Sequence, residues 1–253
     1  MKNPFFSIIT VVFNGENEIE KTINSVLNQS FDDFEYIIID GKSTDKTLSK
    51  IKKYDDNRIK VISESDNGIY DAMNKGLKIV KGKVVGILNC GDLFLKNTIK
   101  IIYDKIKSEN LILTSNFIIT GGLKLINIKT KKYICLKNNN DSLKKLKHFM
   151  SIYHPSTFVS NQSYIDHGLF NHKYKISGDY DLMYRFYSKD INFFFVNEIL
   201  VEMDDLGAST KFKGVVQSAK ETFIIRSNRV NLFTNLFYSI KTIIGYFYKK
   251  LLK

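Results

Sequence analysis

The feature that most constrains the fold is an alternation of strand and helix patterns over the first 110 residues. The strand segments are almost wholly apolar, as strands buried on both faces of a parallel sheet are. The segments between them carry apolar residues at helical spacing. Repeated β-α units predict an α/β fold, in which helices flank a mostly parallel central sheet with right-handed crossovers. The expected strands are 6–13, 34–40, 58–63 and 83–89, and the expected helices are 16–30, 44–54, 69–80 and 96–108.

The pattern changes after about residue 110 and predicts an antiparallel or mixed part of the sheet. Three short strands with glycine and lysine turns are expected there, then a helix, a strand pair and two last helices. No proline- or glycine-rich linker interrupts the chain, so we expect one domain over residues 1–210 and a helical appendage over residues 211–253. The corresponding segments are 110–120, 122–128, 131–136, 179–189, 192–203, 212–230 and 232–252.

Charge narrows the expected partners. The formal net charge is +12, with a sequence pI of about 9.4. Such a balance favours nucleic acid, anionic lipid or phosphate-bearing substrates. The chain has no basic-aromatic RNA-binding signature and no zinc-finger spacing, so nucleic acid is not an expected partner.

Cysteines and apolar runs indicate the compartment. Cys90 and Cys135 lie far apart, which excludes a disulfide framework and a CxxC site, and a reducing, cytoplasmic environment follows by default. The first residues resemble a first strand rather than a signal peptide. No uncharged run approaches the roughly 20 residues that span a bilayer.

Polar residues follow each expected strand of the first half. Ligands of open parallel α/β sheets bind beyond the carboxyl ends of the strands, so these residues are expected to share one site. Taken singly, most of them are better explained as turn or helix-cap residues. Asp40 is harder to explain in this way, because it directly follows three isoleucines. The first loop, "FNGENE", matches neither the dinucleotide fingerprint nor the P-loop.

Four blocks, in this order, resemble glycosyltransferase family 2. They are "SIITVVFNGENEIEKTINSVLNQSFDDFEYIIIDGKSTDKT", "DNGIYDAMNKGLKIVKGKVVGILNCGD", "HPSTF" and "SGDYDLMYR". The resemblance covers about residues 5–205 and is strongest to bacterial enzymes of capsule, O-antigen and colanic-acid-like polysaccharides. It implies the GT-A fold, a nucleotide-sugar donor, inversion at the anomeric carbon, and a glycan or polyprenyl-linked acceptor.

The resemblance also implies roles for individual residues. Many members carry Ser-Asp-Asp after the fourth strand, and the last acid holds Mg²⁺ or Mn²⁺ against the donor diphosphate. The corresponding triplet here is Cys90-Gly91-Asp92, so Asp92 is the expected metal ligand and glycine replaces the middle acid. One carboxylate can suffice, because Mg²⁺ is usually held by one or two carboxylates together with phosphates and water.

Asp179 is the expected catalytic base, and Asp181, two positions further along a helix, should point elsewhere. His154 is expected on the acceptor side, although a structural role is equally compatible with a histidine before proline. The residues implied on the donor side are Thr10, Val12, Asn14, Asp40, Asp71, Lys75 and Asn89.

Two alternatives remain open from the sequence. Because only one acid of the metal motif survives, the chain could be a non-catalytic carbohydrate- or membrane-binding relative. The segment 232–252 has an apolar stripe at helical spacing, with lysines and tyrosines beside it. Such a helix either packs on the domain or lies in the membrane interface. A helix in the membrane interface would make the protein a peripheral enzyme at the inner face of the cell membrane.

Overall fold

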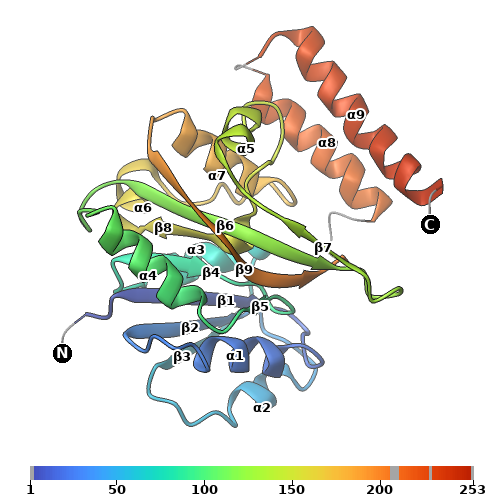
Figure 1. Ribbon diagram of the computed structural model, residues 1–253. Coiled ribbons are helices and arrows are strands. Elements are labelled where there is room, and N and C mark those ends of the chain that lie inside the picture. Colours follow the sequence, from blue (N-terminus) through green and yellow to red (C-terminus); the bar gives the residue numbers. More distant parts are fainter. Residues whose placement is uncertain (1–2, 206–210, 228–229, 252–253) are drawn as a thin grey trace.

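A computed structural model describes residues 3–205, 211–227 and 230–251. It is an α/β structure in which helices cover a central curled sheet (Figure 1). The strands are β1 (Phe6–Val12), β2 (Phe34–Asp40), β3 (Ile59–Ser63), β4 (Val84–Ile87), β5 (Leu93–Phe94), β6 (Phe117–Ile126), β7 (Tyr133–Leu136), β8 (Thr157–Ser160) and β9 (Asn192–Asp204). The helices are α1 (Ile19–Leu27), α2 (Thr47–Ile51), α3 (Ile69–Leu77), α4 (Thr98–Ser108), α5 (Asn140–Lys145), α6 (Asn161–His167), α7 (Gly178–Tyr187), α8 (Phe212–Arg226) and α9 (Leu232–Leu251), with a short 3₁₀ turn at His154–Ser156.

The sheet has the strand order β3-β2-β1-β4-β8-β6-β9-β5, and β7 pairs with β6. Strands β1 to β4 pair in parallel, as the repeat of strand and helix patterns predicts. Pairing of β8 with β4 and β6, of β7 with β6 and of β5 with β9 is antiparallel, whereas β6 and β9 are parallel. The expected mixed part is therefore present, and the carboxyl ends of β1, β2, β3 and β4 share one edge.

Each face of the sheet carries its own apolar core, because successive side chains of a strand point to opposite faces. Ile8 and Val12 of β1 pack with α1 and α4 on one face. Ile9 and Val11 pack with α3 and α7 on the other. This three-layer arrangement buries the repeat segments and leaves only the loops at the strand ends to form a site.

Two expectations about the second half are wrong. The segments 110–120 and 122–128 do not form two strands with a glycine turn between them, since Gly121 and Gly122 lie inside β6. A Cβ at Gly121 would lie 2.5 Å from the Leu200 side chain, so glycine allows close packing rather than a turn. The expected strand pair in 192–203 is one strand, β9, whose register against β6 shifts near residues 196–198. A β-bulge of this kind lets one strand continue through the irregular stretch.

The two C-terminal helices form an antiparallel pair against the rest of the molecule, and α9 is the outer one (Figure 1). Val215, Ala219 and Ile225 of α8 are buried. Arg226, which is 1% exposed, donates hydrogen bonds to the His148 carbonyl oxygen and to polar groups of α9. The segment expected as an appendage is thus packed against the first 205 residues through α8.

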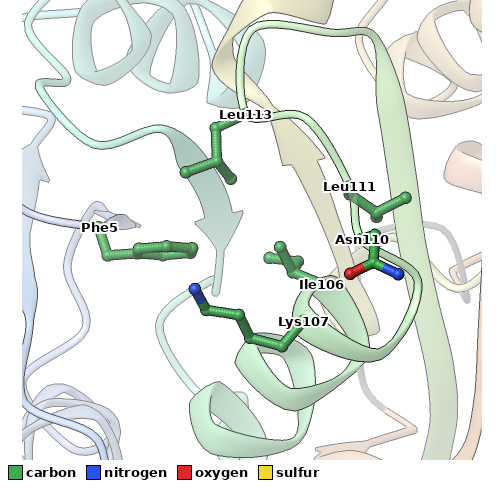
Figure 2. A pocket seen from close by; sticks show the side chains of 6 residues that line it. All are labelled: Phe5, Ile106, Lys107, Asn110, Leu111 and Leu113. Carbon is green, nitrogen blue, oxygen red and sulfur yellow. The ribbon is translucent and has the colours of Figure 1, made fainter.

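None of the helices in the described ranges is long and apolar enough to cross a membrane. A pocket of about 250 Å³ opens beside the C-terminal end of α4 (Figure 2). Phe5, which precedes β1, belongs to its lining, so the pocket lies toward the amino end of that strand, away from the edge where the predicted site residues gather. Its other lining residues are Ile106, Lys107, Asn110, Leu111 and Leu113.

Candidate active site

Asp92 lies just beyond β4, in a buried corner. Its side chain is 7% exposed, and the Asn89 backbone and side chain both hydrogen-bond to its carboxyl group. Burial raises the pKa of Asp92 to about 7, and the nearby charge of Asp204 adds to this effect. Among the described residues, no ion pair includes Asp92. A buried carboxylate without a cation is unfavourable, so this corner suits a positively charged ligand.

The residues before Asp92 leave room for such a ligand. Gly91 has a φ of +101°, which side chains rarely adopt, and a Cβ built there would meet nothing within 4 Å. The Oδ1 atom of Asn89 is buried without a hydrogen-bond partner. Burial raises the pKa of the Cys90 thiol to about 12, so it stays protonated at neutral pH and acts as a small filler.

These observations fit a divalent cation. In the described part of the chain no three His, Cys, Asp or Glu side chains gather into a metal site. The protein would therefore hold the ion through Asp92 and leave other positions to substrate phosphates and water, the usual arrangement for Mg²⁺.

The loops after β1 and β2 are joined by hydrogen bonds of Asn14. This residue has a φ of +51°. Its backbone N–H donates to Ser43 Oγ at 2.8 Å, and its Oδ1 accepts from the Thr44 N–H at 2.9 Å. Two residues before Asn14, the Val12 carbonyl oxygen accepts from the Gly41 N–H at 2.8 Å. The residues predicted for the donor side at the ends of β1 and β2 are thus joined in one corner.

Asp40 and Thr10 are both fully buried. The Asp40 carboxylate accepts the Ser63 hydroxyl at 2.6 Å and the Ser43 N–H at 3.2 and 3.3 Å, so it connects the ends of β2 and β3. The Thr10 hydroxyl accepts from the Tyr36 hydroxyl at 2.9 Å within the core. The Thr10 side chain therefore does not line an open surface, and only its backbone remains for contacts at the strand edge.

Asp71 and Lys75 lie on α3, which follows β3. The Asp71 carboxylate accepts from the Asn67 N–H at 2.9 Å, and this hydrogen bond is the main reason that its pKa is lowered. The Lys75 ammonium group donates to the Ser65 carbonyl oxygen at 2.5 Å and pairs with Glu64 at 3.1 Å. Both side chains therefore shape the loop between β3 and α3.

Asp179 is in the first turn of α7, and the Tyr70 ring of α3 packs beside it. Asp179 Oδ1 accepts from the Tyr180 N–H at 2.8 Å and from the Tyr70 hydroxyl at 3.2 Å. The same hydroxyl donates to the Ile176 carbonyl oxygen at 2.6 Å. Burial raises the pKa of Asp179 to about 6, and the charge of Glu221 contributes. A carboxylate with a pKa near the working pH is suited to general-base catalysis.

The neighbouring residues separate the two acids of α7. A Cβ at Gly178 would lie 2.7 Å from the Tyr70 ring, so glycine lets the ring reach Asp179. Asp181 points elsewhere, as expected from helical geometry, and pairs with Arg185 at 3.4 Å. Only Asp179 is therefore held against α3.

His154 is buried and does not contact Asp179 directly. Its ring meets the Phe170 ring edge-on at a centroid distance of 5.6 Å, and Phe170 stacks on Tyr70 at 5.4 Å. Burial lowers the pKa of His154 to about 4, so the ring is neutral at physiological pH. The predicted acceptor-side residue is thus connected to the predicted base through two aromatic rings.

Two residues near the site were not singled out from the sequence. Tyr70 stands inside the quoted "DNGIYDAMNKG" block, but its contact with Asp179 joins residues 109 apart. Asp204 reaches the Asp92 corner because β9 pairs with β5, where Leu93 faces Glu202. Neither contact has a local signature in the sequence.

Solved structures with the same fold are glycosyltransferases. S. aureus TarS (residues 1–349), in complex with UDP-GlcNAc, has a TM-score of 0.64 at 16% identity, over 96% of this chain and 71% of that one. The mannosyltransferase PcManGT from Pyrobaculum calidifontis, in complex with GDP-Man and Mn²⁺, has a TM-score of 0.66 at 13% identity, over 97% and 74% of the two chains. The fold is therefore the GT-A fold of glycosyltransferases.

The family model described as "Glycosyl transferase family 2" matches residues 7–169, and the chain belongs to that family. An uncharacterized glycosyltransferase of Rickettsia prowazekii is 29% identical over 209 residues, which are 79% of this chain and 64% of that protein. A PGL/p-HBAD biosynthesis glycosyltransferase of Mycobacterium tuberculosis is 25% identical over 201 residues, 74% and 72% of the two chains. The chain spans 58–64% of the length of the first curated relatives that it matches, and all of these relatives are named as glycosyltransferases.

Proposed function

We propose that the protein transfers a sugar from a nucleoside-diphosphate donor to a hydroxyl group of a bacterial surface glycan or its lipid-linked precursor, with inversion at the anomeric carbon. The observation that carries this proposal is the Asp179 carboxylate, held by Tyr70 with a pKa of about 6. Family membership supports glycosyl transfer, and the mycobacterial relative is named for glycolipid biosynthesis.

In this proposal Asp179 acts as the general base. The acceptor oxygen attacks the anomeric carbon and gives its proton to an Asp179 carboxylate oxygen. The new C–O bond forms as the bond from the anomeric carbon to the diphosphate oxygen breaks, and the nucleoside diphosphate leaves with the electron pair. A single displacement of this kind inverts the configuration and forms no covalent intermediate with the enzyme.

On the donor side, the corner around Asp40 and Asn14 would take the nucleoside, and Asn89 with Asp92 would face the diphosphate. Asp71 and Lys75 would lie near the same group. Asp92 would hold Mg²⁺ or Mn²⁺, which supplies Lewis-acid stabilisation of the leaving diphosphate. The titles of the similar structures name UDP-GlcNAc for TarS, and GDP-Man with Mn²⁺ for PcManGT, which supports this class of donor and metal.

A donor screen tests the function. The protein is incubated with UDP-, GDP- and dTDP-sugars, Mg²⁺ or Mn²⁺ and polyprenyl-linked acceptors, and release of the nucleoside diphosphate is measured. Release should require one class of donor, and nuclear magnetic resonance of the product should show the anomeric configuration opposite to that of the donor. A product with retained configuration would contradict the proposed mechanism.

We propose that the enzyme meets its lipid-linked acceptor at the membrane surface, to which α9 binds. The outward face of α9 is apolar: Phe233 is 85% exposed, Leu232 62% and Ile244 61%, while the buried or half-buried positions include Asn235 and Ser239. Phe212 of α8 extends this surface by contacting α9. Leu232, Leu236, Ile240 and Phe247 of the predicted stripe are thus exposed, which favours a peripheral helix in the bilayer interface. The side chains of Tyr248, Lys249, Lys250, Leu251 and Lys253, which also entered that prediction, lie outside the part of the chain whose side chains are described.

Exposed Lys241 on α9 and the net charge of +12 favour binding to an anionic membrane, so we propose that the enzyme works at the inner face of the cell membrane.

The double substitution Phe233→Ser with Phe237→Ser should reduce flotation with anionic liposomes at low salt, because it removes two large apolar groups from the contact. Ile165→Ser, at a position on α6 that is 67% exposed, is the matched control and should float like the wild type. Failure of the wild type itself to float would contradict the proposal. Point substitutions are preferable to removing α9, since buried Arg226 donates hydrogen bonds to side chains of that helix.

A further inference from the structure

We propose that Glu221 of α8 is a positioning residue for the base, because it holds the segment Lys175–Ser177 that leads into Asp179. This inference rests on the proposed role of Asp179 and adds a residue that lies outside the stretch matched to the family. Glu221 does not reach the reacting atoms and acts through the loop.

The Glu221 carboxylate is buried and accepts hydrogen bonds from three successive backbone N–H groups. Its Oε1 accepts from Lys175 at 2.7 Å, and its Oε2 accepts from Ile176 at 3.0 Å and from Ser177 at 2.8 Å. The Gln217 side chain donates to Oε1 at 2.8 Å. Successive backbone N–H groups that converge on one anion fix the conformation of a loop. Here the anion comes from a helix 44 residues further along the chain.

The segment that Glu221 holds is the one that places the base. Ser177 is the residue immediately before α7, and Asp179 follows in the first turn. The Ile176 carbonyl oxygen accepts from the Tyr70 hydroxyl, which also reaches Asp179. A shift of the loop would therefore move both Asp179 and the tyrosine that holds it.

The same segment also touches the donor side. The Lys175 ammonium group donates to the Asn67 carbonyl oxygen at 2.9 Å, and Asn67 donates its N–H to Asp71. Glu221 thus fixes a short connection between the base and the loop before α3. The negative charge of Glu221 also raises the pKa of Asp179. The titratable groups of other elements that act on the Asp179 carboxyl are Tyr70 of α3 and Glu221 of α8.

Glu221→Gln tests the inference. The amide keeps the size but offers one acceptor oxygen, so its NH₂ group faces backbone donors of the loop and repels them. We expect kcat for transfer to fall by about 10- to 100-fold, as misplacement of a reacting group by about 1 Å does. Donor KM and the Kd for the nucleoside diphosphate should stay near the wild-type values. Loss of the negative charge beside Asp179 should also move the acid limb of the pH profile to lower pH.

Two further variants make the result interpretable. Lys220→Gln changes the charge of the exposed neighbouring position on α8 and should leave kcat and the pH profile unchanged. Glu221→Asp keeps the charge on a shorter side chain and should lower kcat without moving the acid limb. Glu221→Asp also tests the positioning role if the Glu221→Gln variant does not fold. In the Asp179→Asn background, Glu221→Gln should cause no further loss, because residues that act as a unit are not additive.

The outcomes separate this inference from the proposed function. Wild-type kcat and pH profile in Glu221→Gln, with Asp179→Asn impaired, would overturn the positioning role alone. A loss of Tm and of donor binding in parallel with kcat would reduce Glu221 to a structural residue and also overturn it. An active Asp179→Asn variant would instead contradict the proposed base itself.

Discussion

Asp179→Asn is expected to lower kcat for sugar transfer by about 10²- to 10⁴-fold, the range by which general-base catalysis accelerates a reaction. The amide is isosteric and can still accept from the Tyr70 hydroxyl and the Tyr180 N–H, so the fold should be kept. Because the base acts in the transition state, donor KM should change little. Steady-state kinetics of nucleoside-diphosphate release with a fixed acceptor measures both quantities.

The pH profile gives an independent check. Burial raises the pKa of Asp179 to about 6, and only the ionised carboxylate can accept a proton. Activity of the wild type should therefore rise as pH increases through about 6 and fall away below it. Asp181→Asn is the matched control, because it changes an acid two residues away that pairs with Arg185. If Asp181→Asn is the inactive variant and Asp179→Asn is not, the assignment is wrong.

The second large effect is expected at Asp92. Asp92→Asn should lower transfer by about 10²-fold or more, since a metal at a developing charge contributes several kcal/mol and each 1.36 kcal/mol is a factor of ten. EDTA should abolish wild-type activity, and added Mg²⁺ or Mn²⁺ should restore it. Calorimetric titration of the metal in the presence of UDP or GDP should show binding to the wild type and none to Asp92→Asn.

Asp204→Asn is a matched control for the electrostatics of this corner. It removes the neighbouring acid that acts on Asp92, but leaves the Asp92 carboxylate and its hydrogen bonds from Asn89 in place. We expect Asp204→Asn to keep metal-dependent activity. Full activity of the wild type in excess EDTA would contradict the metal requirement altogether.

The first half of the fold could be predicted because its signals are local. β2 extends over Phe34–Asp40, the same residues as the strand expected from the sequence, and the β-α repeat predicts its parallel pairing. The second half was less predictable. Gly121 looked like a turn, but it lies within a strand because the Leu200 side chain packs against its backbone, a contact between residues far apart in sequence.

The residues of the candidate site also fall into two groups, those that local motifs predict and those that only long-range contacts reveal. Short motifs that resemble the family predict Asp92 and Asp179 as site residues, and burial raises the pKa of both. Tyr70 and Glu221 were not identified, since each gains its role only from a contact with the loop before α7. A tyrosine on a helix face and a glutamate in a C-terminal helix have many ordinary structural explanations. Only the folded chain shows which backbone groups they meet.

The hydrogen bonds of Asn14 and Asp40 have a consequence for how the donor binds. Asn14 and Asp40 bridge the loops after β1, β2 and β3 through Ser43, Thr44 and Ser63. The conformational entropy of these loops is therefore lost during folding and not when the donor arrives. Nucleotide binding to this corner should be a rigid docking step, and any slow ordering step in the catalytic cycle should involve other segments.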